Sequence, residues 1–164
     1  MMAPRVVTAY FLCSAVSQIF TLQVHTNIYA LNQVQQWFQN CQNVLRLPKP
    51  IWMQMNLVLV EMFTNVVRHA HELLPEDTPI DLELVYGNEL LEIKIWDCGE
   101  YFDFEQMLQK RLLEAKNVRD YVNVDDIPTG GRGLVIAYQI MDDLSYEKVP
   151  DGRNCLRMQK RLRK

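Results

Sequence analysis

The sequence predicts an α+β fold, a two-layer α/β sandwich in which a mixed, mainly antiparallel sheet carries its helices on one face. Apolar and polar residues alternate over 80–84 and 91–95, which indicates two strands of a hairpin with one apolar face each. Apolar residues recur at helical spacing over 28–41 and 134–141. The glycine-rich segment 129–133 does not follow a strand of a βαβ unit, which argues against a Rossmann or P-loop arrangement.

The first half of the chain is expected to contain one strand and two helices. Residues 17–24 alternate as a strand does, and residues 28–44 follow as an amphipathic helix. A proline-containing break then leads to Pro50, which suits the first turn of a second helix. That helix is expected to run to Leu74, because Pro75 disfavours helical geometry in the residue before it.

The second half is expected to supply four strands and two helices. A two-residue turn at Gly87-Asn88 joins the strands of the first hairpin. A helix follows over 104–116, and the polar segment 117–129 is expected to be a mobile loop because it has little apolar surface with which to dock. After the helix that follows the glycine-rich segment, residues 144–149 and 155–162 are expected to form a closing hairpin.

Chain length suits a single domain. The 164 residues can bury one sizeable core, and we expect residues 18–164 to form the domain. Residues 1–17 combine a basic residue with an apolar run, as a signal peptide does, but polar residues interrupt the run and no clear cleavage site follows. We therefore interpret them as an N-terminal extension of a cytoplasmic protein.

Charge and cysteine content narrow the expected partners. A net charge of −3 gives no basic footprint for nucleic acid, and the basic residues over 157–164 are best explained as exposed cations of an amphipathic last strand. The four cysteines form no CxxC pair, which disfavours zinc and redox motifs and fits a reducing compartment. No apolar run is long enough to cross a bilayer, so we expect neither direct nucleic-acid binding nor a membrane partner.

The second predicted helix carries polar residues within an otherwise apolar stretch. Between Val58 and His71, the residues Glu61, Asn65 and His69 recur at every fourth position and so form one row along the helix. A carboxylate and a carboxamide in such surroundings face a desolvation cost of roughly a few kcal/mol each unless they meet partners. They therefore either pair inside the protein or line a site.

Two further motifs lie downstream of this helix. The segment Asp97-x-Gly99 ends a predicted strand and is followed by Phe102-Asp103, and Gly131-x-Gly133-Leu134 opens a predicted helix. Each motif alone is weak, because Asp-x-Gly and Gly-x-Gly usually serve as turns. Their order, and the elements on which they fall, make the combination far more specific.

In this order, the three motifs resemble the N, G1 and G2 boxes of the gyrase, chaperone and histidine-kinase ATPase superfamily, whose fold is called the Bergerat fold. The Glu-x-x-x-Asn-x-x-x-His-Ala helix and the segment 133–146 are most similar to a small stand-alone branch, the anti-sigma factor serine/threonine kinases. The resemblance covers residues 18–162.

The resemblance implies a role for each motif. Asn65 would be the protein's ligand to Mg²⁺, and Glu61 would be the general base that accepts a proton from an attacking hydroxyl. Asp97 would accept a hydrogen bond from the adenine amino group, beside a glycine, Gly99, that lets the backbone approach the purine. The glycine-rich turn and the following helix would hold the phosphates of ATP. The residues implied there are Thr129, Gly130, Gly131, Arg132, Gly133 and Leu134.

Some of these residues have a competing structural interpretation. Glu61 could cap a helix or pair with Arg68 or another cation, and Asp97 could merely begin a strand-end turn. Arg132 could contact the terminal phosphates or be a solvated residue of the loop, and the sequence leaves both open. His69 is expected to be a hydrogen-bonded residue near the helix end rather than a proton shuttle.

The resemblance implies a cytoplasmic serine/threonine protein kinase that is also an anti-sigma factor. With Mg²⁺ and ATP, it would phosphorylate a serine or threonine of an anti-anti-sigma antagonist protein, and it would then be free to hold a sigma factor. Relatives commonly form homodimers, so a homodimer is an expected assembly.

Two other functions compete with the kinase. The alternative is an ATP-gated protein-binding switch without kinase activity. The intact Glu61 argues against this switch. Tyr101 leaves room for the switch, because this tyrosine stands where much of the superfamily has a second G1 glycine. A sensor histidine kinase is disfavoured, because the residues before Ser17 are too few for a dimerisation helix pair.

Overall fold

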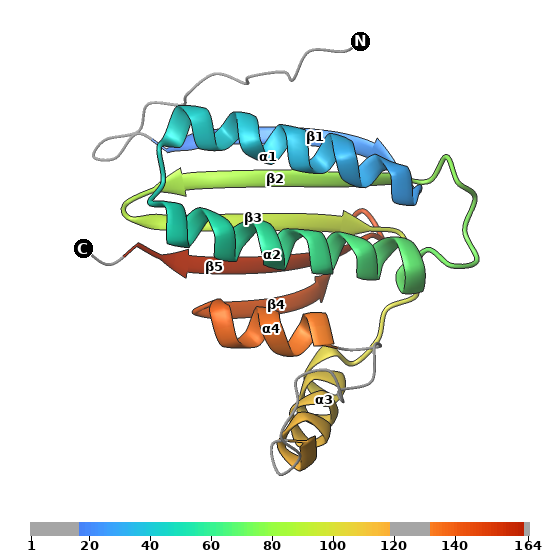
Figure 1. Cartoon of the computed structure of the whole chain (residues 1–164). Helices are drawn as coiled ribbons and strands as arrows, with labels where there is room; N and C mark the ends of the chain where they lie inside the picture. Colours follow the sequence, from blue (N-terminus) through green and yellow to red (C-terminus); the bar gives the residue numbers. More distant parts are fainter. Residues whose placement is uncertain (1–16, 119–131, 163–164) are drawn as a thin grey trace.

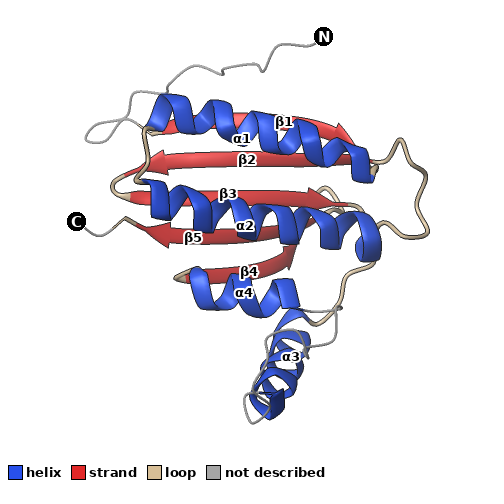
Figure 2. Cartoon of the chain, viewed as in Figure 1, coloured by secondary structure: helices blue, strands red, loops and turns tan. Residues whose placement is uncertain are grey.

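A five-stranded sheet covered by helices on one face makes up the protein (Figures 1 and 2). The structure, a computed structural model, describes residues 17–118 and 132–162. The strands are β1 (Gln18–His25), β2 (Pro79–Gly87), β3 (Leu90–Asp97), β4 (Asp143–Lys148) and β5 (Asn154–Arg161). Their order in the sheet is β1-β2-β3-β5-β4, and each of these pairings is antiparallel. The predicted α+β two-layer sandwich is confirmed.

The helices form the second layer. They are α1 (Leu31–Leu45), α2 (Lys49–Asn65), α3 (Phe104–Val118) and α4 (Arg132–Ile140), with the short helices η1 (Ile28–Ala30) before α1 and η2 (Val66–Ala70) after α2. Figure 2 shows α1, α2 and α4 lying across the same face of the sheet, with α3 projecting beyond its β4 edge.

The core lies between the sheet and these helices. Every second residue of β2 and β3 points into it, as the predicted alternation requires. Six of these side chains are at most 1% exposed: Ile80, Leu82, Leu84, Leu91, Ile93 and Ile95. From α2, a buried apolar face packs against them, made of Met55, Val58, Leu59, Met62 and Phe63.

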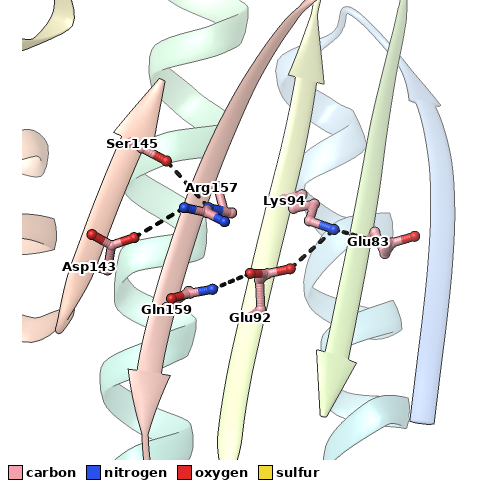
Figure 3. Close-up of polar contacts among 7 residues, drawn as sticks. All are labelled: Glu83, Glu92, Lys94, Asp143, Ser145, Arg157 and Gln159. Carbon is pink, nitrogen blue, oxygen red and sulfur yellow. Dashed lines mark hydrogen bonds and ion pairs between the residues drawn. The ribbon is translucent and has the colours of Figure 1, made fainter. Parts of the chain in front are cut away.

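The opposite face of the sheet carries charged side chains that pair with one another (Figure 3). Lys94 lies 3.0 Å from Glu83 and 3.1 Å from Glu92, which also accepts a hydrogen bond from Gln159. On the neighbouring strand, Arg157 contacts residues of β4. Exposed pairs of this kind contribute about 0–1 kcal/mol each. Arg157 is thus a paired cation of an amphipathic strand.

The first hairpin turns one residue later than predicted. β2 continues through Gly87, and the turn residues are Asn88 and Glu89, whose φ values of 53° and 59° are both positive, as in a type I′ turn. Gly87 has a packing role instead. A Cβ atom on Gly87 would lie 2.5 Å from the Oγ of Ser17, so a side chain at this position would require Ser17 to shift.

The second helix ends earlier than the predicted Leu74. At Asn65 the α-helix passes into the π-helical turn η2, and the N–H of His71 donates to the carbonyl of Val66 at 2.8 Å. Leu73 is already 94% exposed. The wider π turn changes the register of the residues that follow it, which a strict four-residue spacing does not anticipate.

Two predicted segments fall largely outside the described residues. Of the predicted N-terminal extension, only Ser17 is described. Of the predicted loop over 117–129, only residues 117–118 are described, and they belong to α3. Within the described residues, none of the helices has the length and apolar character needed to span a membrane.

The residue after α1 offers a test of the backbone geometry. Arg46 is exposed and has φ 52° and ψ 43°, a left-handed conformation that costs an L-residue about 1–2 kcal/mol. Glycine avoids this cost but loses about 0.5–1 kcal/mol of chain entropy on folding. Arg46→Gly is therefore expected to raise the free energy of unfolding by about 0.5–1 kcal/mol, measured by urea titration.

A matched control lies within α3. Lys110→Gly, at an exposed position inside the helix, should lower the free energy of unfolding by about 1 kcal/mol. A loss of stability in both variants would contradict the left-handed geometry at Arg46.

Candidate functional site

A cavity of about 410 Å³ is formed where α2, η2, α3, α4 and the sheet meet. Its walls are largely apolar, with aromatic rings from Phe102, Phe104 and Tyr146. Its polar lining residues are Asn65, His69, Asp97, Glu100 and Arg111. A concave, mostly apolar cavity of this size with a few convergent polar groups is typical of a small-molecule site.

Asp97 is the most buried of these polar groups, with 2% of its surface exposed. Its Oδ1 accepts from the N–H of Gly99 at 2.9 Å and from Nδ2 of Asn154 at 3.0 Å. Its Oδ2 accepts from the hydroxyl of Tyr146 at 3.1 Å. Burial, reinforced by the negative charge of Asp97, raises the pKa of Tyr146, so this hydroxyl remains a donor at neutral pH.

A count of acceptor sites shows what Asp97 can still bind. An ionised carboxylate has about four lone-pair sites, two on each oxygen. The two donors to Oδ1 fill that oxygen, whereas Oδ2 has the single donor Tyr146. Asp97, which lines the cavity, therefore retains the capacity to accept one further hydrogen bond on Oδ2.

Gly99 lies against the end of η2. A Cβ atom on Gly99 would be 2.5 Å from the carbonyl oxygen of Ala70 and 2.9 Å from its Cβ. Close packing between the turn after β3 and η2 thus accounts for glycine here. The predicted reason was the approach of a purine, which this packing does not require.

His71 is a residue whose role the sequence did not reveal. It is 1% exposed, its Nδ1 lies 2.6 Å from Oγ1 of Thr26, and its Nε2 accepts from the N–H of Cys98 at 2.8 Å. The hydrogen-bonded role expected of His69 belongs to His71, while His69 is exposed and lines the cavity. No spacing signal could have shown this, because the π turn changes the helical register just before His71.

Asn65 and Glu61 lie on successive turns of α2. Asn65 lines the cavity, and its carboxamide forms no hydrogen bond within the described part of the chain. Glu61 reaches the start of α4: a Cβ atom on Gly133 would lie 2.5 Å from Glu61 Oε2. Glu61 has no ion-pair partner among residues 17–118 and 132–162, so the alternative of pairing with Arg68 is not observed.

The second glycine motif is only partly described. Leu134 lines the same cavity as Asn65, and Gly133 packs against the side chain of Glu61. Both predicted residues therefore lie close to the polar residues of α2. Arg132 is half-buried at the first position of α4. The other three predicted residues, Thr129, Gly130 and Gly131, lie outside the described residues.

Tyr101 is accommodated by stacking. Its ring lies 5.7 Å from that of Tyr146 with an interplanar angle of 8°, and the ring of Phe102 lies 4.8 Å from the same tyrosine. Tyr101 therefore packs against Tyr146, a residue that lines the cavity and donates its hydroxyl to Asp97.

Stability at mildly acidic pH tests the state of His71. Burial lowers its pKa from the ordinary value of 6.5, an effect partly offset by the charge of Asp97. Below pH 6.5 the unfolded chain therefore binds a proton that the folded chain does not. The free energy of unfolding is expected to fall as pH decreases below 6.5, and to level off below the pKa of folded His71.

Urea titrations at steps between pH 7.5 and 5.5 measure this dependence. His71→Gln should flatten it, whereas His25→Gln, at an exposed residue of β1, should leave it as in the wild type. Equal slopes for wild type and His71→Gln would contradict a buried neutral imidazole.

Comparison with known proteins identifies the family. The sequence model of the histidine kinase-like ATPase domain family matches residues 25–160 of this chain. Serine-protein kinase RsbW of Staphylococcus epidermidis is 33% identical over 92 residues, which make up 56% of this chain and 55% of that protein, and the same values hold for the proteins of this name from strains ATCC 12228 and RP62A. The match thus spans about half the length of these curated relatives.

A solved structure shares the fold. The structure of the SiaB–SiaC complex from Pseudomonas aeruginosa contains a chain that aligns with a TM-score of 0.59 and 15% identity, over 85% of this chain and 88% of that one. The family match extends from the end of β1 to the last residues of β5 and so includes the whole described site. The chain belongs to the histidine kinase-like ATPase domain family.

Proposed function

We propose that this protein is a serine/threonine protein kinase and anti-sigma regulatory factor that uses Mg²⁺ and ATP. The observation that carries the proposal is the meeting of Asn65 and Asp97, from α2 and β3, in one cavity where each retains free hydrogen-bonding or ligand capacity. Membership of an ATPase family supports the use of ATP. The similarity to a serine-protein kinase supports the transfer of phosphate to protein.

The nucleobase would lie in the apolar part of the cavity. Asp97 would accept the amino group of adenine on Oδ2, its oxygen with remaining capacity. The rings of Phe102, Phe104 and Tyr146 would supply apolar and aromatic surface for the base. Gly99 would hold the backbone of the turn close to η2, and thus near the purine.

The phosphates and the metal would lie toward the start of α4. The Oδ1 atom of Asn65 is a neutral oxygen of the kind that suits Mg²⁺ shared with phosphates, and Mg²⁺ would neutralise phosphate charge there. The start of α4, with Gly133 and Leu134, would contribute the positive end of a helix dipole. Thr129, Gly130, Gly131 and Arg132 would complete the phosphate site.

Glu61 would serve as the general base. Its carboxylate is unpaired within the described residues and lies beside Gly133, where the phosphates are proposed to lie. It would accept the proton of a serine or threonine hydroxyl as that oxygen bonds to the γ-phosphorus and the bond to the leaving ADP breaks. The positive N-terminal end of α4 would also favour a carboxylate at this position.

The proposed protein substrate is an anti-anti-sigma antagonist with a serine or threonine at its contact surface. In its unphosphorylated form it would occupy the kinase, and phosphorylation would release it and free the kinase to hold a sigma factor. The neighbouring structure is named as a complex of SiaB with SiaC, which supports a binding partner for this fold. We place this activity in the cytoplasm and propose a homodimer as the assembly.

A second candidate function is an ATP-gated binding switch without phosphate transfer. Tyr101 favours it, because a bulky ring takes the place of a second G1 glycine and stacks on Tyr146, which donates its hydroxyl to Asp97. Such a protein would bind nucleotide and partner without turnover. Glu61, which has no ion-pair partner within residues 17–118 and 132–162, favours the kinase over this alternative.

A transfer assay with two variants tests the kinase. With radiolabelled Mg-ATP and an anti-anti-sigma antagonist protein from the same organism, the wild type should label the antagonist. Glu61→Gln should lower the transfer rate by about 10²–10⁴-fold, the usual contribution of a general base, while nucleotide affinity changes little. Asn65→Ala should weaken calorimetric Mg-ATP affinity by about tenfold or more, or about 1.4 kcal/mol, while the fold is retained.

Controls at comparable positions make the assay specific. Asn56→Ala, elsewhere on α2, and Glu72→Gln, an exposed residue beyond η2, should both behave as the wild type. Nucleotide binding without labelled antagonist in the wild type would reject the kinase and support the switch. Unchanged Mg-ATP affinity in Asn65→Ala would reject the metal assignment.

A further inference from the structure

The turn that carries Asp97 is held by hydrogen bonds from two other elements. The N–H of Cys98, directly after Asp97, donates to His71 Nε2 at 2.8 Å. On the other side, Nδ2 of Asn154 donates to the carbonyl of Gly99 at 2.9 Å as well as to the carboxylate of Asp97. The position of Asp97 therefore depends on groups that do not line the cavity.

The hydrogen bonds of His71 specify a single protonation state. A backbone N–H can only donate, so Nε2 must carry a lone pair toward Cys98. Nδ1 then carries the proton and donates to Oγ1 of Thr26 at 2.6 Å, and the hydroxyl of Thr26 in turn donates to the carbonyl of Thr78 at 2.8 Å. Each donor in this series of hydrogen bonds is used once. The series links the turn after β3 to Thr26, which follows β1, and to Thr78, which precedes β2.

His71 also connects the two halves of the cavity. It directly follows η2, which continues the helix that bears Asn65 and whose Ala70 packs against Gly99. A side chain at the end of this segment thus joins the helix that bears Asn65 to the turn that bears Asp97.

We propose that His71 is a positioning residue for Asp97 and determines the preference of the site for a purine with a 6-amino group. The proposal rests on the nucleotide site proposed above. Asp97 has one acceptor site left, so a shift of its backbone would misdirect that site even if the cavity remained open. A buried histidine with a purely structural role would change stability and overall affinity, but not the discrimination between two purines.

A pair of nucleotides isolates this effect. ATP and purine riboside triphosphate differ at the 6-amino group of the base, which the second nucleotide lacks. Calorimetric titration with Mg²⁺ is expected to give the wild type a preference for ATP of roughly tenfold or more, as for a hydrogen bond to a charged acceptor. His71→Leu, which offers no hydrogen bond to Cys98, should reduce this ratio to about twofold or less.

Rescue and control variants complete the test. His71→Gln has one acceptor and one donor and should restore most of the ratio, and His25→Leu, at an exposed histidine, should leave it unchanged. Thr26→Val keeps the imidazole but removes the acceptor for Nδ1–H, so it should also lower the ratio. If His71→Leu does not fold, the nucleotide preference of Thr26→Val tests the positioning role instead.

The outcomes separate the two proposals. A wild-type ratio that persists in His71→Leu and Thr26→Val would overturn the positioning role and leave the nucleotide site intact. Failure of the wild type to bind either nucleotide, or equal binding of both, would overturn the assignment of Asp97 and the positioning role with it. A lower ratio that His71→Gln restores would support the positioning role.

Discussion

The packing of the turn at Asp97–Gly99 against the end of η2 is the contact on which the site depends. Ala70 fills the space that a side chain on Gly99 would need. The imidazole of His71 accepts a hydrogen bond from the N–H of Cys98, which lies between Asp97 and Gly99 in the turn. The contact joins a strand end to the helix that carries Asn65. Without it, the strand end that bears Asp97 would lose its direct contact with the segment that follows Asn65.

The number of hydrogen bonds to Asp97 explains why its buried carboxylate is tolerated and why it can still accept another hydrogen bond. A charged group that is 2% exposed needs strong partners, and Asp97 has three donors from the turn, β4 and β5. Three donors leave one acceptor site. The arrangement thus holds the carboxylate in place and still leaves one acceptor site on a residue that lines the cavity.

Much of the fold could be predicted, because strict alternation in β2 and β3 and helical spacing in α1 identify elements that one apolar face stabilises. Asn65, Asp97 and Leu134 could likewise be assigned to one site from motif order and resemblance. The roles of His71 and Gly87 could not, because they depend on a π turn and on a close tertiary contact with Ser17 that leave no periodic pattern. Propensity alone also placed the hairpin turn at Gly87, whereas Asn88 and Glu89 adopt the positive φ values.

The central claim is that Asp97 recognises adenine through the acceptor site that remains on Oδ2. A crystal structure with Mg²⁺ and a non-hydrolysable ATP analogue tests it most directly. We expect the adenine amino nitrogen to lie within hydrogen-bond distance of Asp97 Oδ2, with the hydroxyl of Tyr146 still donating to the same oxygen, and the metal to be bound to Oδ1 of Asn65. An adenine that lies away from Asp97, or a metal that does not contact Asn65, would contradict it.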